Sequence, residues 1–211
     1  MKKYILAILA STMLSATAFA GGVNIGITAS LVDISASGTE TQVGELEKNT
    51  KTGVGNDTAF GSAFIEYSMD NFSFTNAGNG VTVGYSSTPG EVDVSSTIFQ
   101  RIDAVGTPGT DDDAGFRSAQ AKVSDYNNFY VEIPLFKFIY AKYGIASIDV
   151  VTQETSDGDN GTYGDTSVDG EVTGIGIKGK VGDHMVWKVA YEETDFDTIN
   201  LTSSTGNKIS A

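Results

Sequence analysis

The sequence predicts an all-β protein, an antiparallel up-and-down transmembrane β-barrel of about eight strands behind an N-terminal signal peptide. Three observations predict this fold. Apolar residues alternate with polar or small residues along most of the chain, which is the period of a β-strand. The connections between the strands alternate between long and short, as in barrels that have long extracellular loops and short periplasmic turns. The charged residues within the strands share the parity opposite to that of the apolar residues.

Residues 1–20 have the pattern of a secretory signal peptide. A short segment with two lysines is followed by an uncharged apolar run at 4–14. Ala18 and Ala20 then fit a small-x-small cleavage site that would leave Gly21 as the new N-terminus. An uncleaved anchor helix is the alternative, but a spanning helix needs about 20 apolar residues and this run is shorter.

The predicted domain division is a signal peptide at 1–20 and one barrel domain at 21–211. Cleavage would shorten the chain from 211 to 191 residues and, with the loss of Lys2 and Lys3, change the net charge from −14 to −16. So acidic a protein would repel the phosphates of nucleic acids, which excludes them as partners. The 25 glycines argue against a helical protein, because glycine costs about 1 kcal/mol per helix position relative to alanine.

The alternation is clearest at 23–31, where odd positions are apolar and even positions are polar or glycine. The same period predicts further strands. They cover roughly 59–68, 81–86, a segment ending at 134 with its best part at 127–133, 138–151, 172–181 and 185–194, and an eighth strand begins near 207. The long connections would be 33–58, 87–118 and 152–171, the shorter ones 69–80, 135–137 and 182–184, and 195–206 is medium to long.

Parity divides each predicted strand into a lipid face and a lumen face. The apolar, outward set is Val23, Ile25, Ile27, Ala29, Leu31, Ala63, Ile65, Tyr67, Val81, Val83, Tyr85, Phe129, Val131, Ile133, Ile139, Ala141, Tyr143, Ile145, Ile175, Ile177, Val181, Met185, Trp187, Val189 and Tyr191. The charged, inward set is Glu66, Glu132, Lys142, Lys178, Lys180, Lys188 and Glu192. Asp33 and Asp149 fall on the outward parity, where their strands should already have left the membrane.

An eight-stranded barrel has an interior that side chains just fill, and an unpaired buried charge is costly. We therefore expect the seven inward charges to form a salt-bridge network in the lumen, together with Asn24, Thr28 and Tyr140. The alternative is a soluble β-sandwich that carries the same charges on its solvent face.

The segment 125–135, Asp125-Tyr126-Asn127-Asn128-Phe129-Tyr130-Val131-Glu132-Ile133-Pro134-Leu135, resembles a strand and tight turn of small bacterial outer-membrane β-barrels, the eight-stranded OmpA- and OmpX-like kind. The resemblance implies the outer membrane of a Gram-negative-type bacterium, with membrane lipid and the barrel assembly machinery as partners. Members of that family usually end in an aromatic residue. This chain ends at Ala211 after starting an eighth strand, so we expect its last strand to be truncated.

The residues for enzyme chemistry are scarce. His184 is the one histidine, it falls in a short turn, and cysteine is absent. We therefore expect no catalytic residues and no cofactor-binding residues, and no metal site built from histidine or cysteine. Carboxylates in the predicted long loops suit divalent cations such as calcium, although their spacing does not complete an EF-hand and a solvated acidic loop is the alternative. These carboxylates are Asp111, Asp112, Asp113, Asp157, Asp159, Asp165, Asp169 and Glu171.

The leading functional prediction is a non-enzymatic outer-membrane barrel with long acidic extracellular loops, in a structural or surface-interaction role. A narrow pore for small solutes, gated by an interior network of glutamates and lysines, is one alternative. A secreted soluble β-sandwich that acts as a binding module is another. A barrel that binds a hydrophobic ligand is disfavoured, because it would need an uncharged lumen.

Overall fold

The computed structural model describes residues 5–16, 22–41, 49–69, 80–95, 98–103, 115–156, 162–181, 185–204 and 206–211. These residues form one antiparallel sheet. Its strands are β1 (Ile5–Ala16), β2 (Val23–Thr41), β3 (Asn49–Met69), β4 (Val81–Asp93), β5 (Phe99–Asp103), β6 (Gly115–Pro134), β7 (Ile139–Ser156), β8 (Thr166–Val181), β9 (Met185–Phe196), β10 (Asn200–Thr202) and β11 (Lys208–Ser210). The prediction of an all-β, antiparallel, up-and-down fold is confirmed.

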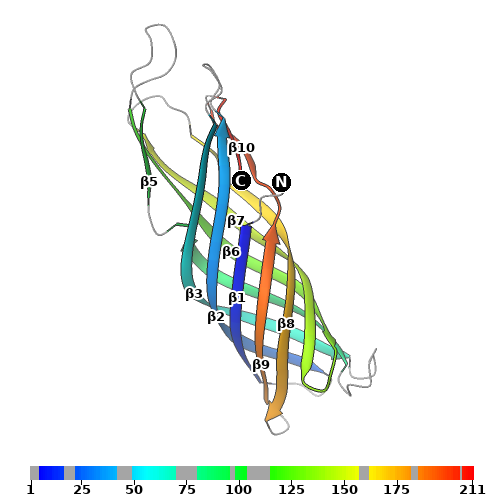
Figure 1. Ribbon diagram of the computed structural model, residues 1–211. Helices are drawn as coiled ribbons and strands as arrows, with labels where there is room; N and C mark the ends of the chain where they lie inside the picture. The colour runs from blue at the N-terminus through cyan, green and yellow to red at the C-terminus, as the bar shows by residue number, and fades with distance from the viewer. Residues whose placement is uncertain are drawn as a thin grey trace.

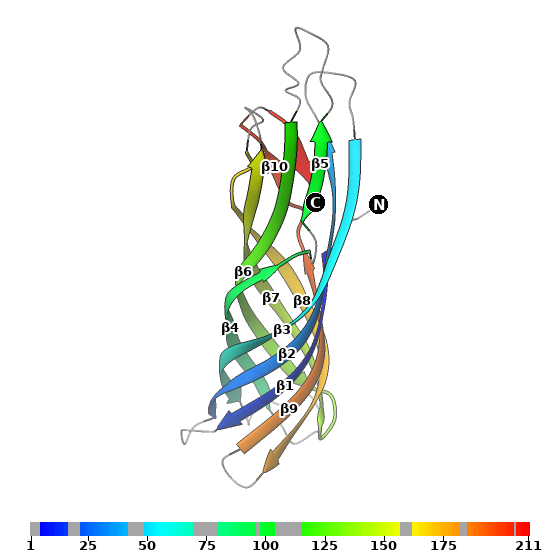
Figure 2. The same ribbon diagram turned by 90° about the vertical axis from the view of Figure 1, so that its left-hand side faces the viewer.

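The strands follow one another around the sheet in the order β1-β9-β8-β7-β6-β4-β3-β2. β1 is hydrogen-bonded to β9 on one side and to β2 on the other. The long strands are tilted and run side by side around a common interior (Figure 1). β5 pairs only with β6, and β10 and β11 form a short pair that continues from the far end of β2. Figure 2 shows these short strands gathered at one end of the molecule.

The strands are longer than the sequence predicted. The segment 33–58 was predicted as a long loop, but β2 continues to Thr41 and pairs with β3 from Asn49 onwards. The predicted loops at 87–118 and 152–171 are likewise shortened by β4, β5, β6, β7 and β8. The prediction of these loops was wrong because it relied on apolar alternation. Backbone hydrogen bonds between antiparallel strands hold a polar hairpin together without an apolar face.

Residues predicted as a signal peptide form β1. The segment has no charged residue and lies between two strands whose edges it completes with backbone hydrogen bonds. The cleavage-site residues Ala18, Ala20 and Gly21 lie outside the described residues, so the signal peptide remains a prediction. β5 and β10 were not predicted either, since each is too short to show alternation.

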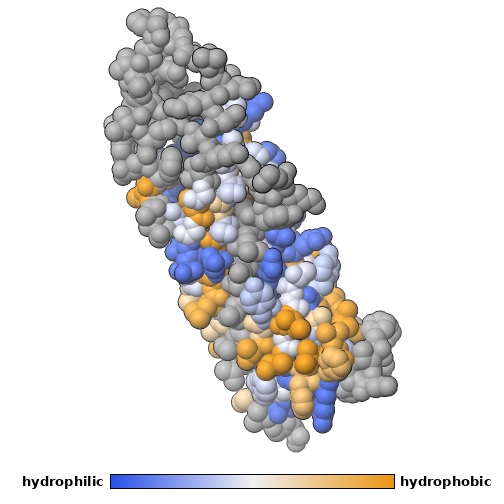
Figure 3. Space-filling view, in the orientation of Figure 1, coloured by the Kyte–Doolittle hydropathy of each residue, from blue (hydrophilic) through white to orange (hydrophobic). Residues whose placement is uncertain are grey.

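The outer face of the sheet carries an apolar belt. Its large exposed side chains are Ile25, Ile27, Leu31, Ile65, Tyr67, Tyr85, Phe129, Ile133, Tyr143, Ile145, Ile175, Ile177, Met185, Val189 and Tyr191. Figure 3 shows hydrophobic side chains gathered over one part of the visible face, with hydrophilic ones beyond them. All of the large exposed side chains of the apolar belt belong to the outward set that the sequence predicted. Val81 departs from that set, because it is buried at the first residue of β4 opposite Met69.

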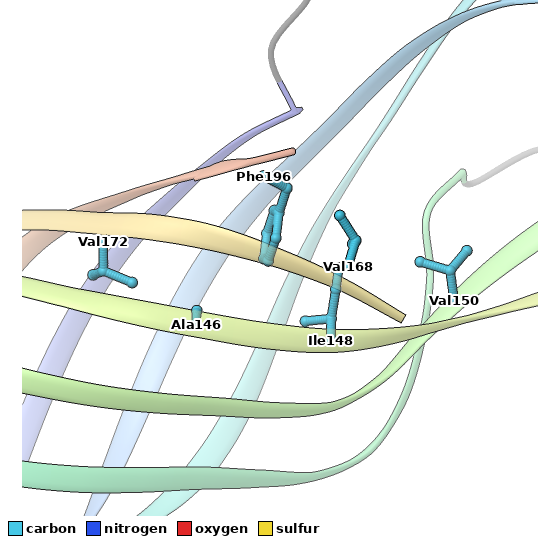
Figure 4. Close-up of a cluster of buried hydrophobic side chains, with 6 residues drawn as sticks. All are labelled: Ala146, Ile148, Val150, Val168, Val172 and Phe196. Carbon is cyan, nitrogen blue, oxygen red and sulfur yellow. The ribbon is translucent and has the colours of Figure 1, made fainter. Parts of the chain in front are cut away.

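The inner face changes in character along each strand. On β2, the buried Thr28 and Ser30 are followed by the buried Val32 and Ile34. On β7, Lys142 is followed by Ala146, Ile148 and Val150 in the same way. Figure 4 shows the larger of two apolar clusters, formed by side chains of β7, β8 and β9, with Phe196 among them. The interior is therefore polar in one half and apolar in the other.

Candidate functional site

Six ionisable side chains meet in the polar half of the interior, and we call them the charge cluster. They come from β3, β6, β7, β8 and β9, and they are Glu66, Glu132, Lys142, Lys178, Lys188 and Glu192. Three carboxylates and three ammonium groups give the cluster a net charge of zero. The structure therefore brings together six of the seven charges that the sequence predicted to point inward. Lys180 does not join them, because it is exposed near the end of β8.

Lys188 is at the centre of the cluster. Its ammonium group donates to Glu132 Oε1 at 2.7 Å and also to Glu66 Oε1. The second oxygen of Glu132 accepts a hydrogen bond from Lys178 at 3.1 Å. Glu132, which is 0% exposed, is thus neutralised by two lysines from two neighbouring strands. Such charge-assisted hydrogen bonds are the strongest kind available to a buried carboxylate.

A second ion pair lies beside the first group. Lys142 Nζ donates to both oxygens of Glu192, at 2.9 and 2.8 Å. The same ammonium group lies 3.9 Å from the centre of the Tyr130 ring. The Tyr130 hydroxyl in turn donates to Glu66 at 2.8 Å. Tyr130 therefore links the two ion-paired groups, and it was missed in the sequence although it shares the parity of Glu132 on β6.

Of the three uncharged partners that the sequence predicted, two are close to the cluster. The Tyr140 ring lies 5.2 Å from Lys178 Nζ and 5.7 Å from Lys188 Nζ. Asn24 reaches it indirectly, through hydrogen bonds that run from Asn24 to Ser68, from Ser68 to Thr82 and from Lys178 to Thr82. Thr28 does not take part, since its hydroxyl has no hydrogen-bond partner among the described residues.

Two glycines make room for the tyrosines. A Cβ atom at Gly84 would lie 2.5 Å from Cζ of Tyr130, and one at Gly176 would lie 2.5 Å from Cζ of Tyr140. Both tyrosine side chains are fully buried. The hydroxyl end of each ring thus lies against the backbone of a neighbouring strand, at a position where only glycine leaves enough space.

Replacing Gly84 by alanine is expected to displace the Tyr130 ring, break its hydrogen bond to Glu66 and lower the free energy of unfolding by about 1–3 kcal/mol, as overpacking of a core does. Urea unfolding of the purified protein measures this change. Gly61→Ala is the matched control, because the nearest atom to a Cβ there is 3.6 Å away. Equal stability of the two variants would contradict the close approach at Gly84.

The side chains of the charge cluster are closely packed and paired with one another. Glu66, Glu132, Lys142, Lys188 and Glu192 are each at most 4% exposed, so their side chains occupy the interior at this level. Every carboxylate in the cluster is bound by a lysine.

The other predicted sites fall mostly outside the described residues. This applies to His184 and to Asp111, Asp112, Asp113, Asp157 and Asp159. Asp165 accepts a hydrogen bond from the backbone of Thr152, and Asp169 and Glu171 are exposed. In the described part of the chain, no three potential metal ligands lie together. That part also contains no helix long and apolar enough to cross a membrane.

No protein-family model matches the chain, and no curated protein or solved structure is significantly similar to it.

Proposed function

We propose that this chain is a non-enzymatic β-barrel of a bacterial outer membrane, of the OmpA- and OmpX-like kind, with a structural or surface-interaction role. The observation that carries the proposal is the reversed distribution of side chains. Large apolar residues are exposed on the outer face, while five charged residues are buried in the interior. A protein in water has the opposite arrangement, whereas a barrel in lipid needs this one.

The size of the apolar belt supports a location in a membrane rather than in water. Monomeric soluble proteins rarely expose continuous apolar patches of more than a few hundred Å². Ile27 and Leu31 are each 68% exposed, and similar side chains project from neighbouring strands all along the sheet. Charged residues appear on the outer face beyond the belt, where Asp33 pairs across the strands with Asp57. A belt with a polar border fits a bilayer and its headgroup region.

The pairing of the strands supports the same proposal. Backbone groups inside a bilayer must find partners within the protein, and only helices and closed barrels achieve this. In the described part of the chain, β2, β3, β4, β6, β7, β8 and β9 each have a strand on both sides through the belt. A soluble sandwich would instead need two sheets with their apolar faces packed together. The partners we propose are membrane lipid and the assembly machinery, with divalent cations at the acidic loops.

The proposal predicts that the folded protein requires detergent or lipid to stay in solution. It also predicts that an unboiled sample runs at a different position from a boiled one on a denaturing gel, because a barrel resists the detergent until it is heated. Both measurements need only the purified protein. A chain that stays folded and monomeric in water without detergent would refute the barrel.

The packed cluster supports a sealed interior over the pore alternative. Side chains that are less than 5% exposed leave little room for a continuous water path at the level of Glu66 and Glu132. Recording from planar bilayers separates the two functions. Stable conductance steps of the reconstituted protein would favour the pore.

A further inference from the structure

The apolar half of the interior contains a cavity of about 200 Å³. Strands from all around the sheet contribute to its wall, which includes Val32, Ile34, Phe60, Val123, Ile148 and Phe196. The described part of β10 and β11 covers one end of the cavity, where Leu201 and Ile209 are paired. The sequence prediction disfavoured a hydrophobic ligand, because it placed charged residues throughout the interior. The structure divides it into two.

A hydrogen-bonded layer separates the cavity from the charge cluster. On β9, Glu192 belongs to the cluster and Phe196 to the cavity wall, with the buried Thr194 between them. The hydroxyl groups of Thr194 and Tyr126 lie 3.3 Å apart at this level. Tyr126 has the inward parity of Asn128 and Tyr130, and a β-bulge of β6 at Asp125, whose φ is 52°, turns Val123 inward as well. In the described part of the chain, the apolar cavity and the charge cluster are thus separate regions of the interior.

Three of the four hydroxyl groups in the described part of the wall already have a hydrogen-bond partner. The hydroxyl of Thr88 is bonded to Ser62, that of Thr152 to the carbonyl of Tyr163, and that of Tyr126 to Thr194. Among the described residues, no lysine, arginine, aspartate or glutamate lines the cavity. A ligand with a charged head or strong hydrogen-bonding groups would lose its hydration here and gain nothing in return.

We propose that this cavity binds a small uncharged hydrocarbon of about the size of an alkylbenzene. Protein interiors are packed with few voids larger than a water molecule, so a cavity of this size is unusual. An engineered apolar cavity of about 150 Å³ stays dry and takes up benzene, which is the behaviour expected of this wall. The aromatic rings of Phe60, Tyr126 and Phe196, from three different strands, offer faces and edges to a flat guest. Binding depends on the apolar cavity and not on the membrane location.

The test uses the full chain, held in a polymer that lacks alkyl detergent chains, with its isoleucine methyl groups labelled for NMR. Toluene is the probe. Ile34 and Ile148 line the cavity, while Ile27 and Ile65 face outward and report toluene that merely dissolves around the protein. We expect the methyl signals of Ile34 and Ile148 to shift and saturate. A response confined to Ile27 and Ile65, or one that never saturates, would overturn the proposal.

A variant that fills the cavity completes the test. Ala121→Phe places a ring in the wall and should abolish the saturable shift of Ile148, whereas Ala63→Phe on the outer face should leave it unchanged. Ala36→Leu, near the covered end of the cavity, is a milder replacement with the same expected loss if the first variant does not fold. Octanoate, which has a similar size and a negative charge, should not bind. A saturable shift that persists in either filled variant, or octanoate binding as tightly as toluene, rules out the proposed site.

Discussion

Replacing Lys188 by methionine is expected to lower the free energy of unfolding by about 3–5 kcal/mol, the range found when one partner of a buried ion pair is removed. Lys188 donates to both Glu66 and Glu132, and its loss leaves Glu66 with only the Tyr130 hydroxyl. The charge cluster would then contain three carboxylates and only two ammonium groups. Equilibrium unfolding in urea, followed in detergent micelles, measures the change.

Lys180→Met is the matched control for this variant, since it removes a lysine of the same kind that is exposed near the end of β8. Its effect should be within a few tenths of a kcal/mol, as for most surface substitutions. Removing Lys142 and Glu192 together, as Lys142→Met with Glu192→Leu, should be less harmful than either change alone, because no charge is left unpaired. If Lys188→Met were no worse than Lys180→Met, the cluster would not be held together by these ion pairs.

Replacing Ile27 by lysine is expected to destabilise the membrane-bound protein by about 2–4 kcal/mol, the range measured for lysine and arginine on the lipid face of barrels near the bilayer centre. Ile27 is 68% exposed in the middle of the apolar belt, so in water the same change would be harmless. The experiment therefore tests which solvent the outer face meets. Unfolding of the protein in lipid bilayers, rather than in micelles, gives the clearest reading.

Asp33→Lys serves as the control on the same strand, six residues or about 20 Å further along β2 at roughly 3.3 Å per residue. Asp33 is exposed opposite Asp57, so a lysine there replaces a like-charge pair by an opposite-charge pair. We expect no loss of stability. A protein that tolerates Ile27→Lys as well as Asp33→Lys would have an outer face in water, against the proposed function.

Residue parity predicted the inner and outer faces well wherever a strand is regular. The same rule fails on β6, because this strand changes parity at its bulge. Asn128, Tyr130 and Glu132 face inward on one side of Asp125, and Ala121 and Val123 line the cavity on the other. The alternation of residues in a single sequence does not reveal where a strand contains the extra residue of a β-bulge.

The strand lengths escaped prediction for a different reason. Residues 33–41 and 49–58 are rich in small polar residues, which are typical of loops when each segment is considered alone. They form strands because each supplies the hydrogen bonds that the other lacks, over a ladder that ends at Thr41 and Asn49. This pairing depends on two segments at once. The contact of Tyr130 with Gly84 could not be predicted for the same reason, because the need for glycine at position 84 depends on the ring of a residue on another strand.

The place of β1 in the sheet bears on how this protein is made. β1 alone joins β9 to most of β2, and it consists of residues that a signal peptidase is predicted to remove. In the proposed membrane location, a chain cleaved after Ala20 would have two unpaired sheet edges, and unsatisfied backbone groups in a bilayer are costly. β11 runs along the same edge of β2, antiparallel to it, at Thr39–Thr41. If residues 1–20 are removed as the sequence predicts, export processing and completion of the sheet compete for one segment, and a cleaved chain would need another strand in the place of β1.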